Sequence, residues 1–307
     1  KLIFVDIDRN TLNIDPKEVI KAINSKTKLI FAVNLLGNPC DLDDLKSICK
    51  KNNIVLIEDN CESLGAKYHN DYTGTCGVMG TASTLACITE SLGMMLPGGA
   101  TIPSVFADRL RHGEAVGKRA IGLAKEVIKP SQVMTPDAFE NALRVLLAIG
   151  GSTNGIIHLT AIAGRLGIKI DFEAFDRMGS ETPVLIDLKP TGQYYMDDFF
   201  KAGGLSNILR ELKPLLKLNC LTITGRTLGE EIDAFPEPFD QDVIRSLNNP
   251  IHSGGGIAFL KGNLAGDGAI IKQSAASPEL LVHTGRAVIF DSLDDLAKRI
   301  DGFMTSA

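Results

Sequence analysis

The sequence lacks the features that would place it at once among metal-ribbon, disulfide-rich or nucleic-acid-binding proteins. Its six cysteines include no C-x-x-C pair, and five of them fall in the first third of the 307 residues, which argues against a zinc ribbon and a disulfide framework. Lys and Arg number 32 against 37 Asp and Glu, a net charge of −5. No broad cationic surface is therefore expected for nucleic acid or anionic lipid.

Long apolar runs are also absent, and there is no tryptophan. The runs in KLIFVDID and KLIFAVNLL are about nine residues or fewer, well short of the ~20 residues that span a bilayer, so we expect no membrane helix, no signal peptide and a cytoplasmic location. What is present is 44% hydrophobic residues and a mean hydropathy of +0.10, enough for a large core or for two domains. Because the chain opens on Lys1 within a strand-like run, we expect it to start in the middle of a domain.

Residues 1–60 alternate short β-branched runs with amphipathic segments, which is typical of a parallel α/β sheet. LIFVDID, LIFAVNLL and IVLIED are predicted strands. Asp15 is predicted to cap a helix with Pro16 at its first position, and a second helix is predicted after Pro39 from the spacing of apolar residues. Asp59 ends the third strand, at the edge of a parallel sheet where ligands bind.

The ordered motifs LIFVDID, TLNIDP, NLLGNPCD, IEDNCESLGAKY and YTGT make residues 1–80 resemble the DegT-type family of PLP-dependent nucleotide-sugar aminotransferases and deoxysugar dehydratases. The resemblance implies that Asp59 pairs with the pyridinium nitrogen of PLP. It also implies that Glu62 lies beside the phenolic oxygen of the cofactor. Without this resemblance, Asp59 is also explained as an acidic residue that caps the turn after a strand. The Schiff-base residue expected shortly after Gly80 is absent.

From residue 74 onward the chain resembles a second family, the iron-sulfur dihydroxy-acid and sugar-acid dehydratases. The resemblance rests on GTCGVMGTASTLACITESLGMMLPGGATIPS, TPDAFENALRVLLAIGGSTNGIIHLTAIAGRLGI, ETPVLIDLKPTGQYYMDDFFKAGG, CLTITGRTLGE and GGGIAFLKGNLAGDGAIIKQSAASPELLVHTGRAVIF. It implies an iron-sulfur cluster and Mg²⁺, a small-molecule acid substrate and a homo-oligomer. Other cluster cysteines, the magnesium motif and the catalytic serine motif of this family are missing from the sequence.

Cys76 lies in the glycine-rich turn GTCGVMG, just before a predicted amphipathic helix. The resemblance makes Cys76 one of three thiolate ligands of the cluster, an arrangement that leaves one iron open as a Lewis acid. Cys87 lies eleven residues further along the sequence and is better explained as a small buried apolar residue than as a ligand.

GGSTN, with Ser152, Thr153 and Asn154, lies between two predicted helices, the first of which is expected to start at Thr135 and Pro136. Backbone N–H groups at a helix start can bind an anion, and the resemblance places the substrate carboxylate near this segment. A simple helix cap by Ser152 or Thr153 is the equal alternative.

These patterns predict an α/β fold: parallel-sheet fragments from two enzyme families, followed by the start of a β-rich C-terminal domain. We expect a partial PLP-transferase-like segment over residues 1–75, a partial dehydratase N-terminal α/β domain over 76–245, and the start of its C-terminal domain over 246–307, where IAFLKGNL, GAIIK and RAVIF read as short strands.

Three functions stay open. The first is a dehydratase lineage that converts a 2,3-dihydroxy acid or sugar acid to a 2-keto acid, in a chain that cannot catalyse alone. The second is a PLP-dependent lineage, and the third is a non-enzymatic, incomplete polypeptide. Both families share the text G-T-x-G-x-M-G-T-x-S at the junction, which suggests a chimera of two fragments. Incomplete fragments are expected to expose apolar patches and to associate.

Overall fold

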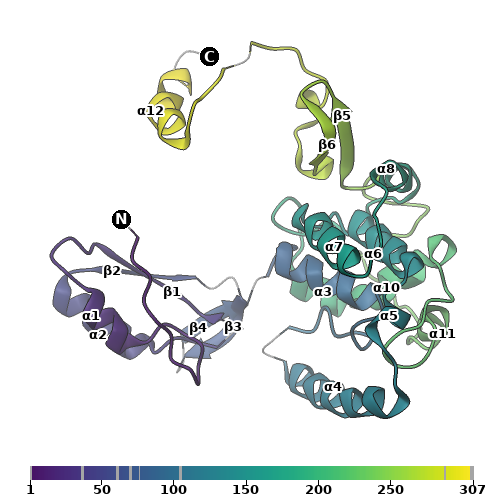
Figure 1. The fold of residues 1–307 in the computed structure, drawn as a ribbon, viewed down its shortest axis with the longest axis horizontal. Coiled ribbons are helices and arrows are strands. Elements are labelled where there is room, and N and C mark those ends of the chain that lie inside the picture. The colour runs from purple at the N-terminus through teal and green to yellow at the C-terminus, as the bar shows by residue number, and fades with distance from the viewer. Residues whose placement is uncertain are drawn as a thin grey trace. The chain divides into compact units, whose positions relative to one another are not determined.

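The computed structural model describes residues 2–35, 38–59, 62–68, 71–75, 77–103, 106–286 and 288–304, and divides into the units Lys1–Ala275 and Ala276–Ala307. Figure 1 traces the chain from purple at the N-terminus to yellow at the C-terminus. The first unit holds nearly all of the elements named below. The second holds the short 3-10 turn Pro278–Leu280 and helix α12 (Leu293–Met304).

The N-terminal part of the first unit is a small α/β arrangement, as predicted. Strands β1 (Leu29–Val33) and β2 (Val55–Asp59) pair in parallel, with Leu29 opposite Val55 and Val33 opposite Asp59. Helix α1 (Pro16–Ala22) starts at Asp15, whose side chain accepts from the Lys17 N–H. Helix α2 (Leu42–Asn52) completes the arrangement. Local capping and periodicity signals therefore predicted these four elements correctly. The prediction that LIFVDID is a strand is wrong, because residues 2–8 form only the isolated bridge between Ile7 and Ile14.

The two faces of the β1–β2 pair differ in burial. Ile30 and Ala32 are buried in a cluster with Leu42 and Leu45 of α2. On the opposite face, apolar side chains stay between 39% and 60% exposed: Leu29, Phe31, Val33, Val55 and Ile57. The expected exposure of apolar surface is thus confirmed for this sheet. An antiparallel hairpin of β3 (Glu62–Tyr68) and β4 (Asp71–Thr75) follows.

The central part of the chain, from α3 to α11, is helical (Figure 1, blue to green). Its helices are α3 (Thr81–Ser91), α4 (Ala107–Glu126), α5 (Pro130–Val133), α6 (Pro136–Ala148), α7 (Asn154–Arg165), α8 (Phe172–Glu181), α9 (Met196–Lys201), α10 (Gly204–Glu211) and α11 (Leu228–Asp233), with a 3-10 turn at Lys213–Leu215. The predicted helix start at Thr135 and Pro136 is confirmed, since the Thr135 hydroxyl accepts from the Ala138 N–H.

The parallel sheet predicted within residues 76–245 is not found among the described residues of that range. The apolar segment PVLID forms only isolated bridges, in which Val184 meets His252 and Ile186 meets Ile244. Leu185 and Ile186 are buried against helices α9 and α10. Its apolar composition fits this burial by helices. A short apolar run alone does not tell a buried strand from a buried extended loop.

The core of this helical region forms two apolar clusters. One surrounds α9 and α10 and includes Phe199; the other lies between α6, α7 and α8 and includes Phe139 and Phe175. All three phenylalanines are at most 2% exposed. These clusters fix the helices that carry the candidate site.

The C-terminal β prediction holds in part. Strands β5 (Ala258–Gly262) and β6 (Ala265–Ile271) form an antiparallel hairpin, followed by a 3-10 turn at Gln273–Ala275. RAVIF is not a strand at the residues described there, Arg286 and Val288–Phe290, which have no strand partner and are followed by α12. No helix in the described part of the chain is long and apolar enough to cross a membrane.

Candidate functional site

The GGSTN segment meets the start of α3, although the two are about 70 residues apart in sequence. The hydroxyl oxygens of Thr81 and Ser152 lie 3.0 Å apart, and the Asn154 amide donates to the Thr81 hydroxyl at 3.0 Å. The Ser152 N–H donates to the Thr84 hydroxyl, also at 3.0 Å. Two of the three predicted residues, Ser152 and Asn154, are therefore joined to the helix that follows the cysteine turn.

This contact joins two helix N-termini. Thr81 is the first residue of α3 and Asn154 the first residue of α7, and neither helix receives a side-chain cap from Gly80 or Thr153. Neither helix has an acidic residue in its first turn. The first N–H groups of α7 already have partners, because Asn154 donates to the Ser152 hydroxyl, and Gly155 and Ile156 donate to the Ser152 and Thr153 carbonyls. The start of α3 and the positive ends of both helix dipoles are therefore what this contact offers to an anion. Thr153 is the N-cap residue of α7, but its side chain makes no capping bond. The Ser152 hydroxyl instead accepts from the Asn154 N–H at 3.3 Å, so a helix cap by Ser152 stays open as the alternative to an anion site.

Gly151 makes the close approach possible. A Cβ atom at this position would lie 2.7 Å from the Leu146 Cδ1 and 2.8 Å from the Thr84 Cγ2. Any larger residue would push the loop away from α3. The preceding Gly150 has a φ of +52°, a backbone conformation that favours glycine.

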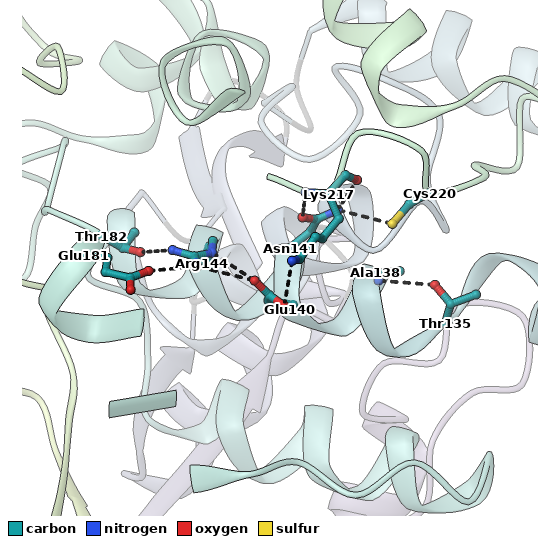
Figure 2. A network of polar contacts seen from close by, with 9 residues as sticks. All are labelled: Thr135, Ala138, Glu140, Asn141, Arg144, Glu181, Thr182, Lys217 and Cys220. Carbon is teal, nitrogen blue, oxygen red and sulfur yellow. Dashed lines mark hydrogen bonds and ion pairs between the residues drawn. The ribbon is translucent and has the colours of Figure 1, made fainter. Parts of the chain in front are cut away.

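A polar network on α6 holds the helix that leads into this loop (Figure 2). The buried Asn141 amide donates to the Lys217 carbonyl at 3.0 Å and accepts from the Lys217 N–H at 2.8 Å. Arg144, with 10% of its side chain exposed, pairs with Glu181 at 3.0 Å and donates to the Thr182 hydroxyl. Removing one partner of such a buried network leaves the others unsatisfied, so the network fixes α6 and, through it, the position of Gly150–Asn154.

The segment after Cys76 is tied to the rest of the site by backbone bonds. The Met79 N–H donates to the Lys189 carbonyl at 2.8 Å, and the Met196 N–H donates to the Gly77 carbonyl at 2.9 Å. The predicted cluster ligand, Cys76, lies outside the described residues, as does Cys61.

The four described cysteines, Cys40, Cys49, Cys87 and Cys220, are free and buried. Burial raises the pKa of the Cys40 thiol to about 11 and the pKa of the Cys87 thiol still further, whereas a metal ligand has to be a thiolate. The prediction that Cys87 is a buried apolar residue is confirmed. Within the described residues no group of three or more His, Cys, Asp or Glu side chains is placed to hold a metal ion. These donors do not fit an iron-sulfur cluster or a magnesium site.

Asp59, the predicted partner of PLP, ends β2 at the carboxyl edge of the parallel pair, as expected from the sequence. Its carbonyl accepts from the Asn34 N–H at 3.1 Å. Glu62 begins β3, and its side chain lies outside the described part of the chain. The sequence has no lysine between Lys67 and Lys118, so a Schiff-base lysine does not follow the hairpin, and the residues fit PLP only at Asp59.

Glu90 is a buried charged residue that was not among the predicted site residues. This side chain is 5% exposed and accepts from the Gly98 and Ala100 N–H groups, each at 2.8 Å. Burial raises its pKa to about 7, partly opposed by these two bonds. The signal was present, because Glu90 is the one charged residue between Asp71 and Asp108. Its carboxylate holds the loop between α3 and α4.

The family model of the dihydroxy-acid/6-phosphogluconate dehydratase N-terminal domain matches residues 51–231, more than half of the chain. The C-terminal model of the same enzymes matches residues 242–306. The chain therefore belongs to the dihydroxy-acid/6-phosphogluconate dehydratase family. Residues 1–89 match the DegT/DnrJ/EryC1/StrS aminotransferase family. The two matches overlap at residues 51–89, which contain the GTCGVMG turn.

Two curated relatives illustrate the dehydratase match. Dihydroxy-acid dehydratase of Acetivibrio thermocellus is 46% identical over 72% of this chain and 40% of its own length. L-arabinonate dehydratase of Rhizobium leguminosarum bv. trifolii is 47% identical over 75% of this chain and 40% of its own length. The chain thus spans about 40% of the length of these relatives.

The similar solved structures concern a smaller part of the chain. GDP-4-keto-6-deoxy-D-mannose-3-dehydratase of E. coli with bound hydrated PLP is 51% identical over 22% of this chain and 18% of that chain, with a TM-score of 0.22. The aminotransferase of Psychrobacter cryohalolentis is 39% identical over 22% of this chain and 17% of that chain, with a TM-score of 0.21.

Proposed function

We propose that the greater part of this chain derives from a hydro-lyase that removes water from a 2,3-dihydroxy acid or a sugar acid to give a 2-keto acid. Membership of the dehydratase family supports this lineage. The single structural observation that carries the proposal is the meeting of the starts of α3 and α7 at Thr81 and Asn154, where α3 has no side-chain cap and neither helix has an acidic residue in its first turn. Such a pair of helix ends suits the carboxylate that both classes of substrate share.

In this proposal Ser152, Thr153 and Asn154 form the carboxylate-binding segment. Ser152 and Asn154 are already oriented by bonds to Thr81, and the Thr153 side chain, which makes no cap bond, is free to donate to a bound anion. Cys76 keeps its proposed role as a cluster ligand. Because the described donors do not fit a cluster or a magnesium site, we derive no chemical step through either group.

The chain is proposed to bind an acid without catalysing its dehydration. A panel of 2,3-dihydroxy acids and sugar acids, assayed for 2-keto acid after iron-sulfur reconstitution, tests this directly. We expect no turnover above the rate without protein. Turnover at the rate of a full-length family enzyme would contradict the proposed incompetence.

Carboxylate binding is tested by replacing Ser152 with Ala in the full chain. We expect the variant to bind L-arabinonate several-fold more weakly than the wild type, as measured by chemical-shift titration of ¹⁵N-labelled protein. Ser246→Ala is the matched control, because Ser246 is exposed and lies in a different loop. Equal weakening by both substitutions would argue against a carboxylate site at Ser152.

A PLP-dependent lineage is the second candidate for residues 1–75. The position of Asp59 at the carboxyl edge of β1 and β2 favours it, and the lack of a nearby lysine opposes catalysis. Absorption spectra separate the candidates: a brown charge-transfer envelope after iron-sulfur reconstitution supports the dehydratase lineage, and a yellow aldimine band after PLP addition supports the second. The absence of both bands would support a non-enzymatic polypeptide.

The proposed boundaries follow the two lineages, with residues 1–75 from the PLP-type family and residues 76–245 and 246–307 from the dehydratase. The overlap of the two family matches at residues 51–89 supports a junction in the shared motif. One long sequencing read across codons 60 to 100 tests whether the junction exists in the gene. An uninterrupted read would rule out an assembly artefact.

A further inference from the structure

A cavity of about 90 Å³ lies beside the contact between Thr81 and Ser152. Met79 and Gly150 line it, and each precedes one of the two contacting residues by two positions. The cavity therefore begins next to the proposed carboxylate site. Its volume suits a fragment of a few heavy atoms, such as the end of a short acid.

Polar side chains supply the surface that a ligand would meet in this cavity. Five of the apolar residues around it are no more than 5% exposed and offer little surface: Met79, Ile149, Val184, Ile186 and Leu188. A sixth, Ile251, is partly exposed. The remaining side chains with polar groups are Asp187, Thr191, His252 and Ser274. A ligand in the cavity is therefore met by a carboxylate, an imidazole and two hydroxyls.

Backbone bonds hold Asp187 and His252 in place. The Asp187 carbonyl accepts from the Gln193 N–H at 2.9 Å and from the Tyr194 N–H at 3.0 Å, which closes a tight turn. A Cβ atom at Gly192 would lie 2.2 Å from the Asp187 Oδ1, so only glycine allows this turn to fold over the carboxylate. The His252 carbonyl accepts from the Val184 N–H at 2.9 Å. Both side chains thus sit on fixed backbone.

We propose that this cavity binds the hydroxylated tail of a sugar acid, and that Asp187 and His252 select such acids over acids with a branched aliphatic tail. The inference rests on the proposed function, which places the substrate carboxylate at Thr81 and Ser152. The orientation follows from charge, since Asp187 attracts hydroxyl donors and repels a carboxylate. An aliphatic tail would remove water from Asp187 and His252 without replacing their hydrogen bonds.

The test compares two acids on the full chain by chemical-shift titration of ¹⁵N-labelled protein. L-arabinonate carries a hydroxylated tail, and 2,3-dihydroxy-3-methylbutanoate carries a branched aliphatic one. We expect L-arabinonate to bind at least tenfold more tightly. Asp187→Asn should weaken L-arabinonate binding about fivefold, equivalent to about 1 kcal/mol, and leave the binding of the aliphatic acid unchanged.

Two further variants keep the test interpretable. His252→Gln should reduce the preference for L-arabinonate in the same direction, which covers the case in which Asp187→Asn fails to fold. Asp240→Asn is the matched control, because Asp240 is exposed and does not line the cavity. It should leave both affinities unchanged.

The outcomes separate this inference from the proposed function. Equal binding of the two acids, with both weakened by Ser152→Ala, would overturn the cavity assignment and leave the carboxylate site standing. A preference for L-arabinonate that is lost in Asp187→Asn, together with affinities for both acids that Ser152→Ala leaves unchanged, would support the cavity and overturn the carboxylate placement. Failure of both acids to bind at 20 mM would overturn both the cavity assignment and the carboxylate site. Such a dissociation constant corresponds to binding on the order of 2 kcal/mol weaker than that of a millimolar ligand.

Discussion

Helix α6 buries ten of its 13 residues, whereas strand β1 buries only every second residue and exposes Phe31 on its other face. Both elements are apolar enough for a core. The difference is that α6 packs against apolar residues of α7 and α8, while the apolar side chains on the outer face of β1 and β2 stay at least 39% exposed in the described part of the chain. Apolar sequence alone therefore does not tell the two regions apart. An element is stabilised by its apolar side chains only where other apolar residues of the fold bury them.

The largest expected effect comes from emptying the covered core. Phe175→Ala should lower the free energy of unfolding by about 3 to 5 kcal/mol, because it leaves a cavity in a fully packed cluster. Phe31→Ala should cost about 1 kcal/mol or less, since Phe31 is 52% exposed. Urea unfolding followed by far-ultraviolet circular dichroism measures both values. Equal losses would remove the contrast between the two regions.

The second prediction concerns the pH dependence due to Glu90. Its pKa is raised to about 7 in the folded protein, so between pH 4.5 and 7 the folded state binds more protons than the unfolded state. The free energy of unfolding should therefore fall as the pH rises through this window, by on the order of 3 kcal/mol. The measurement is the difference in stability between the wild type and Glu90→Gln at several pH values. A difference that does not change with pH would contradict the buried carboxylate.

The third prediction addresses the exposed sheet face. Replacing Phe31 with Ser and Ile57 with Thr together should reduce association, because two exposed apolar side chains of one face are removed. Sedimentation velocity over a range of protein concentrations measures this effect. Leu264→Ser is the control: Leu264 is 98% exposed but lies apart on the β5–β6 hairpin. Similar changes in both proteins would show that the sheet face has no special role.

The smallest expected effect is at a helix cap in the covered region. Thr135→Ala removes the hydroxyl that accepts from the Ala138 N–H at the start of α6. A loss of about 1 kcal/mol is expected. Thr135→Ser, which keeps the hydroxyl, should retain most of the stability in the same urea assay. A larger loss for Ser than for Ala would contradict the cap.

The sequence predicted an element correctly where the hydrogen bonds or side-chain pattern that define it involve residues close together in the chain. Asp15 and Thr135 mark helix starts through hydrogen bonds to residues two or three positions away, and Pro16 marks one through its fixed φ. The β1 and β2 strands follow from short β-branched runs. The parallel sheet expected within residues 76–245 is not found among the described residues of that range. Helices from elsewhere in the chain bury the apolar segment around Leu185, and no local sequence pattern indicates such burial.

The candidate site was predicted only in part, for the same reason. The GGSTN composition indicated a helix start that could bind an anion, and the structure adds the Thr81 partner some 70 residues earlier. Asp187 and His252 lie 65 positions apart in the sequence, and both line the cavity next to the Val184–His252 bridge. Neither carries a local signal of ligand binding, so their shared cavity could not be predicted without the fold.

Helix α6 is buried among other helices, whereas the β1–β2 pair is covered by apolar residues on one face only. Hydrogen exchange on the full chain tests this difference most directly. Mass spectrometry of peptides from α6 and from β1 gives the two exchange rates in one sample. We expect amides of α6 to exchange only through global unfolding, and amides of Leu29–Val33 to exchange at least about 100-fold faster through local opening. Equal protection of α6 and β1 would contradict the account.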